Sequence, residues 1–194
     1  MKIKNNKRNY FLLFLIFFVF PFYSNAYVPA STHAGLTDQT IIFYNFNFYK
    51  KISNEEKERI IQGSIEEDEP SKRALNHFYD PVRNMGINNS RTSKEWALNN
   101  SLVENDFSWP KIIKYFAEGD EKKAFIGLGH ILHLIEDLTV PEHTRNDPHM
   151  GEGLFGLYTN DSPYEKWADE TKNRSTLKDV SNDYISQNLK VKTF

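Results

Sequence analysis

Apolar and polar positions along the chain recur with a helical period, and no stretch shows a convincing two-residue alternation of the kind that β-strands need. A first helix is predicted from about Leu36 to Tyr49, where Phe, Tyr and Ile residues predominate, which indicates a buried element. A second helix begins after Ser53, because Ser53 is a good N-cap and Glu55 and Glu56 favour a first turn.

The rest of the chain continues the helical pattern. The predicted elements are a short helix or turn after Pro70, a loop from Val82 to Ser93, helices that begin at Ser93 and at Trp109, a long helix from about Glu121 to Asp137, a loop from His143 to Asn160, a helix opened by Ser162 and Pro163, and an amphipathic helix after Ser175. The fold class is therefore all-α, a helical bundle. Its predicted core aromatics are Phe43, Phe46, Tyr49, Phe78 and Trp96.

The first 26 residues differ from the rest and are predicted to be a secretory signal peptide. Four basic residues precede an unbroken apolar run from Phe11 to Phe20, and a small-residue cleavage site ends at Ala26. An uncleaved membrane anchor is the alternative interpretation. A lipoprotein is excluded, because the chain has no Cys to acylate. Residues 27–194 are then one exported domain, which we expect to be secreted or periplasmic.

Charge and cysteine content narrow the chemistry. Loss of residues 1–26 removes four positive charges and no negative ones, which changes the formal charge from −2 to −6. An acidic domain is poorly suited to holding a long polyanion, so no stable nucleic acid partner is expected. The absence of Cys rules out disulfides and thiolate ligands. Any metal site must use His, Asp, Glu, backbone or water, and such a site would also supply folding energy.

The segment from Leu128 to His143 carries the strongest candidate chemistry. His133 and Asp137 are four residues apart, so on a helix their side chains leave the same face one turn apart. His143 follows soon after Val140 and Pro141, where the helix must end. A carboxylate buried beside imidazoles is costly unless something pairs with it, and both groups are standard zinc ligands. The pattern predicts a metal site.

Four motifs together resemble the zinc-dependent phospholipase C family of bacteria and, more distantly, the trinuclear-zinc single-strand nucleases of the same helical fold. They are T-H-A-G-L-T at 32–37, H-F-Y-D-P at 77–81, L-G-x-x-L-H-x-x-x-D-x-x-x-P-x-H at 128–143 and S-P-Y-E-K-W at 162–167. They span nearly all of residues 27–194 in the family's order. The third motif is the most specific. The resemblance implies a bundle with two or three zinc ions in a cleft at one end.

The resemblance assigns the first zinc to His77, His133 and a carboxylate from the acidic stretch before His77. Asp68 is the preferred carboxylate, and Glu67 is its main rival. Asp137 would bridge this zinc to a second one.

The second zinc would be held by His33 and by the amino group and carbonyl of the residue that follows the cleaved signal peptide. Here that residue is Tyr27, where the family usually has Trp.

The third zinc would be bound by His143 and Glu165. The family has a His one helical turn before this Glu, but the present chain has Asp161 there. Asp161 is the preferred third ligand, and His149 from the preceding loop is an almost equal alternative.

Four further residues lie beside these motifs. His130 shares the helical face of His133, but the family does not use this position, so we expect it to pack or to support a ligand. Glu136 is expected to pair with a cation or to lie at the helix surface. Arg145 and Asp147 are expected to stabilise the loop after the third motif, and Arg145 could instead contact a substrate phosphate.

The resemblance implies a zinc-dependent phosphodiester hydrolase of phospholipase C type. Its substrate would be a phospholipid or another phosphodiester, with peripheral contact to a membrane surface, and its products diacylglycerol and a phosphorylated headgroup. Asp68 would orient or deprotonate the attacking water. Two alternatives stay open: a single-strand nuclease with the same fold, and a metal-stabilised helical domain that has lost catalysis. The sequence does not indicate an oligomeric state.

Overall fold

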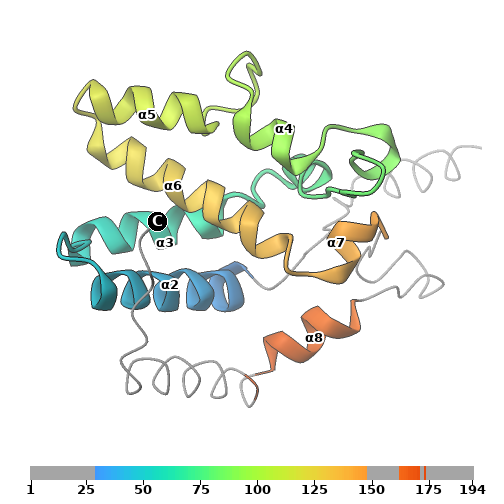
Figure 1. Ribbon diagram of the computed structural model, residues 1–194, viewed down its shortest axis with the longest axis horizontal. Helices are drawn as coiled ribbons and strands as arrows, with labels where there is room; N and C mark the ends of the chain where they lie inside the picture. The colour runs from blue at the N-terminus through green and yellow to red at the C-terminus, as the bar shows by residue number, and fades with distance from the viewer. Residues whose placement is uncertain (1–28, 148–161, 171–172, 174–194) are drawn as a thin grey trace, which may run out of the picture.

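Helices make up the described part of the structure, a computed structural model in which residues 29–147, 162–170 and 173 are described (Figure 1). The elements are the π-helical turn η2 (Pro29–His33), α2 (Ala34–Asn47), α3 (Asn54–Glu66), the 3-10 turns η3 (Ser71–Asn76) and η4 (Ile87–Asn89), α4 (Ser93–Leu98), α5 (Trp109–Ala117), α6 (Glu121–Asp137), α7 (Pro141–Arg145) and α8 (Pro163–Asp169). These residues contain no strand, only an isolated antiparallel bridge between Asp80 and Met85. The all-α prediction is confirmed for them.

Side-chain caps fix where the helices begin. The Ser53 side chain accepts a hydrogen bond from the backbone N–H of Glu56, and the Glu56 carboxylate accepts one from the backbone N–H of Ser53. The same capping box, made by Thr92 and Glu95, opens α4. Asp120 caps α6 and Ser162 caps α8. The predicted starts at Ser53 and Ser162 and the predicted bounds of the long helix are therefore confirmed.

The central contact of the bundle is between α3 and α6, which cross at two glycines. A Cβ atom on Gly63 would lie 1.8 Å from the carbonyl oxygen of Ile126, and one on Gly129 would lie 2.0 Å from that of Ile60. Only glycines allow the two backbones to approach so closely. Figure 1 shows α6 running across the molecule, with α5 on one side of it and α3 and α2 on the other.

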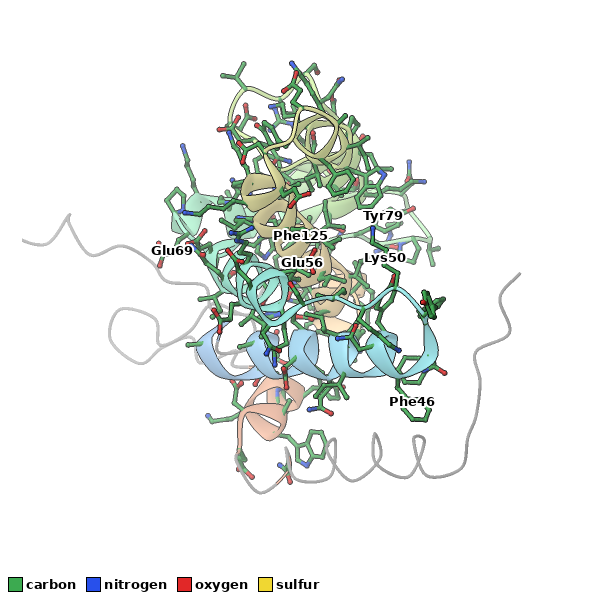
Figure 2. The ribbon with its side chains drawn as sticks, turned by 90° about the vertical axis from the view of Figure 1, so that its left-hand side faces the viewer. Phe46, Lys50, Glu56, Glu69, Tyr79 and Phe125 are labelled. Atoms are coloured by element: carbon green, nitrogen blue, oxygen red, sulfur yellow. The ribbon has the colours of Figure 1, made fainter. Side chains whose placement is uncertain are left out.

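Helix α2 is less buried than its composition predicts. Ile41 and Thr37 are buried against the bundle, but Phe46 is 44% exposed and Tyr49, just after the helix, is fully exposed. Figure 2 shows the Phe46 side chain pointing away from the helices. The prediction that Phe46 and Tyr49 belong to the core is wrong. Helix α2 packs on α3 and α6 and, through Leu36 near its start, on α8, whereas Phe46 near its end and Tyr49 after it are exposed. Phe43 is half-buried, and Phe78 and Trp96 are buried as predicted.

Two short helices close the end of the bundle at which α6 stops (Figure 1). Residues 143–145, predicted as loop, belong instead to α7, because Pro141 at its first position favours a new helical turn. Helix α8 is held by a hydrogen bond from Thr32 to Asp169 and by the packing of Ala168 against Val140 and Leu36.

The signal peptide and the helix predicted after Ser175 lie outside the described residues. Among the described helices, none combines the length and the apolarity needed to cross a bilayer.

Candidate metal centre

Four histidines from four parts of the chain surround Asp137, the last residue of α6. His33 is the N-cap of α2, His77 follows η3, His133 lies one turn before Asp137, and His143 lies in α7. All five side chains are at most 2% exposed. The structure thus brings together residues that the sequence separates by more than one hundred positions.

Three of the histidines are oriented by an acceptor on their Nδ1 atom. Nδ1 of His33 lies 2.7 Å from Glu136, Nδ1 of His133 lies 2.6 Å from the carbonyl oxygen of Ser64, and Nδ1 of His143 lies 3.3 Å from the carbonyl oxygen of His77. An Nδ1–H that donates to an oxygen leaves Nε2 to act as a metal ligand, and fixes the ring plane.

His77 is turned the other way. Its Nδ1 atom lies 2.8 Å from Oδ2 of Asp137 and 3.6 Å from Oδ1 of Asp68, and its Nε2 atom faces Oε1 of Glu67 at 3.6 Å. His77 therefore presents Nδ1 to the cluster, and Glu67 lies behind it.

The distances from His133 to two carboxylates are close to those between ligand atoms of a zinc ion. Bonds of about 2.0–2.1 Å in a tetrahedron place ligand atoms roughly 3.3–3.5 Å apart. Nε2 of His133 lies 3.3 Å from Oδ2 of Asp137 and 3.6 Å from Oδ1 of Asp68. Asp68, His77 and His133 each place one ligand atom within 4.8 Å of the other two. We name these three residues the first group, together with Asp137, whose Oδ2 atom lies 2.8 Å from Nδ1 of His77 and 3.3 Å from Nε2 of His133.

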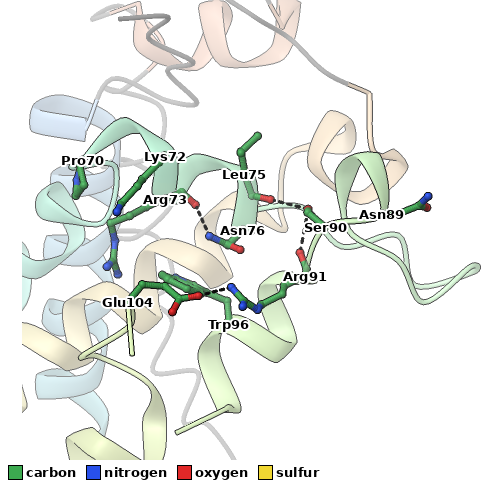
Figure 3. Close-up of a pocket in the computed structure, with 10 residues that line it drawn as sticks. All are labelled: Pro70, Lys72, Arg73, Leu75, Asn76, Asn89, Ser90, Arg91, Trp96 and Glu104. Atoms are coloured by element: carbon green, nitrogen blue, oxygen red, sulfur yellow. Dashed lines mark hydrogen bonds and ion pairs between the residues drawn. The ribbon is translucent and has the colours of Figure 1, made fainter. Parts of the chain in front are cut away.

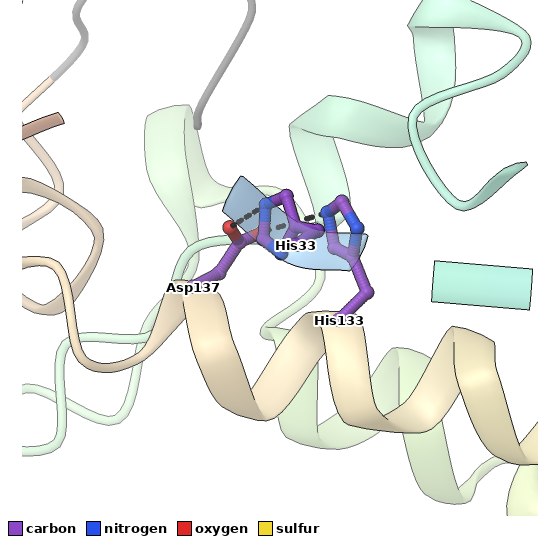
Figure 4. A group of neighbouring side chains, drawn as sticks. All are labelled: His33, His133 and Asp137. Atoms are coloured by element: carbon purple, nitrogen blue, oxygen red, sulfur yellow. Dashed lines mark ion pairs between the residues drawn. The ribbon is translucent and has the colours of Figure 1, made fainter. Parts of the chain in front are cut away.

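Asp137 also faces a second set of atoms with its other oxygen. Oδ1 lies 3.4 Å from Nε2 of His33, whose ring stacks on that of His133 at 3.7 Å between centroids (Figure 4). His33 and Asp137 are the second group. The third group is His143 and Glu165, with 3.3 Å between Nε2 and Oε1. Because its two oxygens face different imidazoles, Asp137 is placed to bridge the first and second groups.

The electrostatics of the cluster fit a bound cation. Burial would lower the pKa of His33, but the Asp137 and Glu136 carboxylates raise it to about 9. Burial would also lower the pKa of His77, but the charge of Asp137 and the nearby carboxylates raise it to about 10. Burial would raise the pKa of Asp137, but the imidazoles around it hold it well below its ordinary range. These carboxylates thus attract positive charge strongly.

The lack of hydrogen-bond partners for two buried carboxylates also supports a bound cation. Among the described residues, neither oxygen of Asp68 and neither oxygen of Asp137 has a hydrogen-bond partner of acceptable geometry. A buried, ionised carboxylate without hydrogen bonds is unfavourable unless it is paired or binds a metal. The donor set of imidazole nitrogens and carboxylate oxygens suits zinc, and the residues present therefore fit a divalent metal.

The structure brings most of the predicted ligands together. Asp68 lies in the first group, whereas its rival Glu67 points to the far side of His77. The predicted ligands Tyr27 and Asp161, and the alternative His149, lie outside the described residues.

The residues beside the predicted ligands had mixed outcomes. His130 is buried, stacks on Phe107 at 4.1 Å and donates from Nδ1 to Glu67, in agreement with a supporting role. Of the two alternatives for Glu136, the surface position is wrong, because the side chain is buried and accepts hydrogen bonds from His33 and Thr37. Pairing with a cation agrees with its contact to His33, whose pKa is raised to about 9. The spacing of three between Glu136 and His133 was the signal that sequence reasoning missed, because residues three apart on a helix are neighbours.

Two charged residues lie at the edge of the cluster. Arg145, the last residue of α7, forms an exposed ion pair of 2.8 Å with Asp147. This pair agrees with a role in stabilising the end of α7.

Comparison of the chain with protein-family models, with curated proteins and with solved structures finds no match in any of the three.

Proposed function

We propose that the protein is a secreted, zinc-dependent phosphodiester hydrolase of phospholipase C type, with the helical fold that this family shares with the trinuclear-zinc nucleases. The observation that carries the proposal is the placement of Asp137, whose two oxygens face His33 on one side and His77 and His133 on the other. One carboxylate between two sets of imidazoles offers each of two metal ions an oxygen ligand beside nitrogen ligands.

In this proposal Asp137 bridges two zinc ions, and Asp68 binds one of them and accepts a proton from the attacking water. Zinc ions bound there would supply Lewis-acid stabilisation of the phosphoryl oxygens and a water of lowered pKa. Oδ1 of Asp68 lies 3.6 Å from both His77 and His133, which leaves Oδ2 to accept a proton. Water adds its oxygen to phosphorus and gives one proton to Asp68. The bond between phosphorus and the glycerol oxygen breaks, and the proton held by Asp68 passes to that oxygen, which yields diacylglycerol and a phosphorylated headgroup and returns Asp68 to its carboxylate form.

A phospholipid is the substrate we favour, because exposed aromatic residues flank the third group. Glu165 is buried, but Tyr164 and Trp167 on either side of it in α8 are 40% and 48% exposed. Tyr and Trp are the residues that proteins place where apolar and aqueous surroundings meet. The formal charge of −6 for residues 27–194 also disfavours a polynucleotide.

Metal analysis and hydrolysis assays test the proposal together. The purified protein is expected to hold two or three zinc ions per chain and to release diacylglycerol from phosphatidylcholine vesicles, with activity lost in a chelator and restored by zinc. Cleavage of single-stranded DNA instead of the lipid would make the protein a nuclease. Two or more zinc ions with neither activity would leave a metal-stabilised helical domain, and zero or one zinc would overturn the multi-metal site.

Asp137→Asn tests the bridging role. It is expected to abolish hydrolysis and to lower both zinc content and thermal stability, because one change removes a ligand from two groups. Glu121→Gln is the matched control, since Glu121 lies exposed at the other end of the same helix. Full activity in Asp137→Asn would remove the central claim.

A further inference from the structure

Glu67 is a fully buried carboxylate next to the candidate ligand Asp68, and the first group does not include it. Its Oε2 atom accepts hydrogen bonds from the guanidinium of Arg73 and from Nδ1 of His130. Its Oε1 atom accepts one from the indole N–H of Trp96 at 2.7 Å. These donors belong to η3, α6 and α4, so three separate elements hold the carboxylate in one orientation.

The remaining neighbour of this carboxylate is His77. Oε1 of Glu67 lies 3.6 Å from Nε2 of His77, while Nδ1 of the same ring faces Asp137 and Asp68. An imidazole whose Nε2–H is attracted to a carboxylate must use Nδ1 as its ligand atom. The contact between Glu67 and His77 is an ion pair and is longer than a hydrogen bond. A carboxylate on the Nε2 side of His77 favours, through its charge, the orientation in which Nδ1 faces Asp137 and Asp68, opposite to that of the other three histidines.

The same arrangement occurs a second time in the molecule. Glu136 precedes Asp137 in the sequence, as Glu67 precedes Asp68. In each pair the Asp faces a metal group, and the longer Glu lies behind a histidine of the cluster: Glu136 behind His33, and Glu67 behind His77.

The outer side of Glu67 is closed by its own partners. The guanidinium of Arg73 lies over the ring of Trp96, 5.0 Å from its centroid, and both line a hollow of about 700 Å³ (Figure 3). An ion pair between Arg91 and Glu104 lies at this hollow as well. Arg73 and Trp96 therefore separate Glu67 from the hollow.

We infer that Glu67 is a positioning residue of the first group, which holds His77 so that Nδ1 points at the metal, and that Arg73, Trp96 and His130 hold Glu67 in turn. The inference rests on the proposed multi-metal site. A purely structural role for Glu67 would stabilise the fold without acting through His77. A double-mutant cycle with zinc affinity as its readout separates these two roles.

The test compares Glu67→Gln with and without His77→Ala, by zinc titration against a chromophoric chelator. In the wild-type background Glu67→Gln is expected to weaken one zinc by 10- to 100-fold and to leave the others unchanged. In the His77→Ala background it is expected to have no further effect. Glu136→Gln is the matched control, because it changes the partner of His33 and should weaken zinc equally in both backgrounds.

Two further variants keep the result interpretable. Trp96→Phe keeps the ring and removes one donor to Glu67, so it should weaken the same zinc by a smaller factor even where Glu67→Gln folds poorly. Arg91→Gln, which breaks the ion pair at the hollow, should change nothing. Equal loss in both His77 backgrounds, or unchanged affinity in Glu67→Gln, would overturn the inference alone. A wild-type protein that binds no zinc would overturn the proposed function and the inference with it.

Discussion

Replacement of Gly129 by Ala perturbs the helix contact beside which the candidate metal centre lies. A Cβ atom at this position would lie 2.0 Å from the carbonyl oxygen of Ile60 and 2.7 Å from the backbone nitrogen of Ser64, and contacts shorter than 3.0 Å essentially never occur. These neighbours are backbone atoms of α3, so no side chain can move aside. The two helices must therefore separate by about 1 Å at the crossing.

The expected loss of stability can be estimated from the interactions that are broken when α3 and α6 move apart. The hydrogen bond from Nδ1 of His133 to the carbonyl oxygen of Ser64 is 2.6 Å long and lies beside the crossing. A 1 Å shift would lengthen it to about 3.6 Å, beyond hydrogen-bond range. Its loss costs about 1 kcal/mol, and the overpacking costs about 1–3 kcal/mol. Gly129→Ala is thus expected to lose about 2–4 kcal/mol and to weaken zinc binding roughly tenfold, because His133 loses its orientation.

Urea unfolding of the chelator-treated protein measures the first effect, and zinc titration measures the second. Gly35→Ala is the control, because a Cβ atom at Gly35 meets nothing within 4 Å and Ala suits a helix better than Gly. A stability for Gly129→Ala within 0.5 kcal/mol of that of Gly35→Ala, together with unchanged zinc affinity, would refute this account of the α3–α6 crossing.

The pKa values of about 9 for His33 and about 10 for His77 lie above the ordinary value of 6.5, so their contribution to the stability of the metal-free protein is complete below pH 6.5 and is lost as pH rises toward 9–10. The urea midpoint measured in chelator should fall between pH 6.5 and 10, and a midpoint that rises across this range would contradict the assignment. Glu165→Gln should remove one zinc by metal analysis and leave the first group occupied, because Glu165 contacts His143 alone among the histidines of the cluster; loss of all zinc would contradict the separate third group. Tyr49→Ser should change the free energy of unfolding by less than about 0.5 kcal/mol, because the side chain is fully exposed; a larger loss would return Tyr49 to a core.

Local signals were enough to predict the long helix and its two ligands. Asp120 caps α6 and Pro141 prevents its continuation, so both ends are set by neighbouring residues. The spacing of His133 and Asp137 then follows from the helical period alone. The approach of α3 to α6 was not predicted, because it depends on glycines in two distant helices that meet only in the folded chain.

The aromatic residues of α2 show the limit of composition as a guide to burial. Phe, Tyr and Ile residues lie around much of this helix, which favours burial on every side. In the described residues α2 packs on α3 and α6 and, near its start, on α8, so Ile41 is buried, whereas Phe46 near its end is exposed. A sequence gives the apolar residues of a helix but not the number of faces that find a partner.

The two Glu-Asp pairs were the least predictable part of the site, and they are also the part that organises it. A Glu beside a ligand Asp is ordinarily expected at a helix surface, because an ionised carboxylate is costly to bury. Here both carboxylates are buried with hydrogen-bond donors around them: Arg73, Trp96 and His130 donate to Glu67, and His33 and Thr37 donate to Glu136. Each Glu also lies against a histidine whose other nitrogen faces the cluster. A negative charge makes burial unfavourable for a lone Glu. In Glu67 and Glu136 the same charge attracts one ring nitrogen of His77 and of His33, and so orients each imidazole. A Glu-Asp pair in the sequence therefore does not by itself predict a buried Glu. The prediction also needs the histidine that lies beside the Glu, and that histidine comes from a distant part of the chain and approaches only in the folded protein.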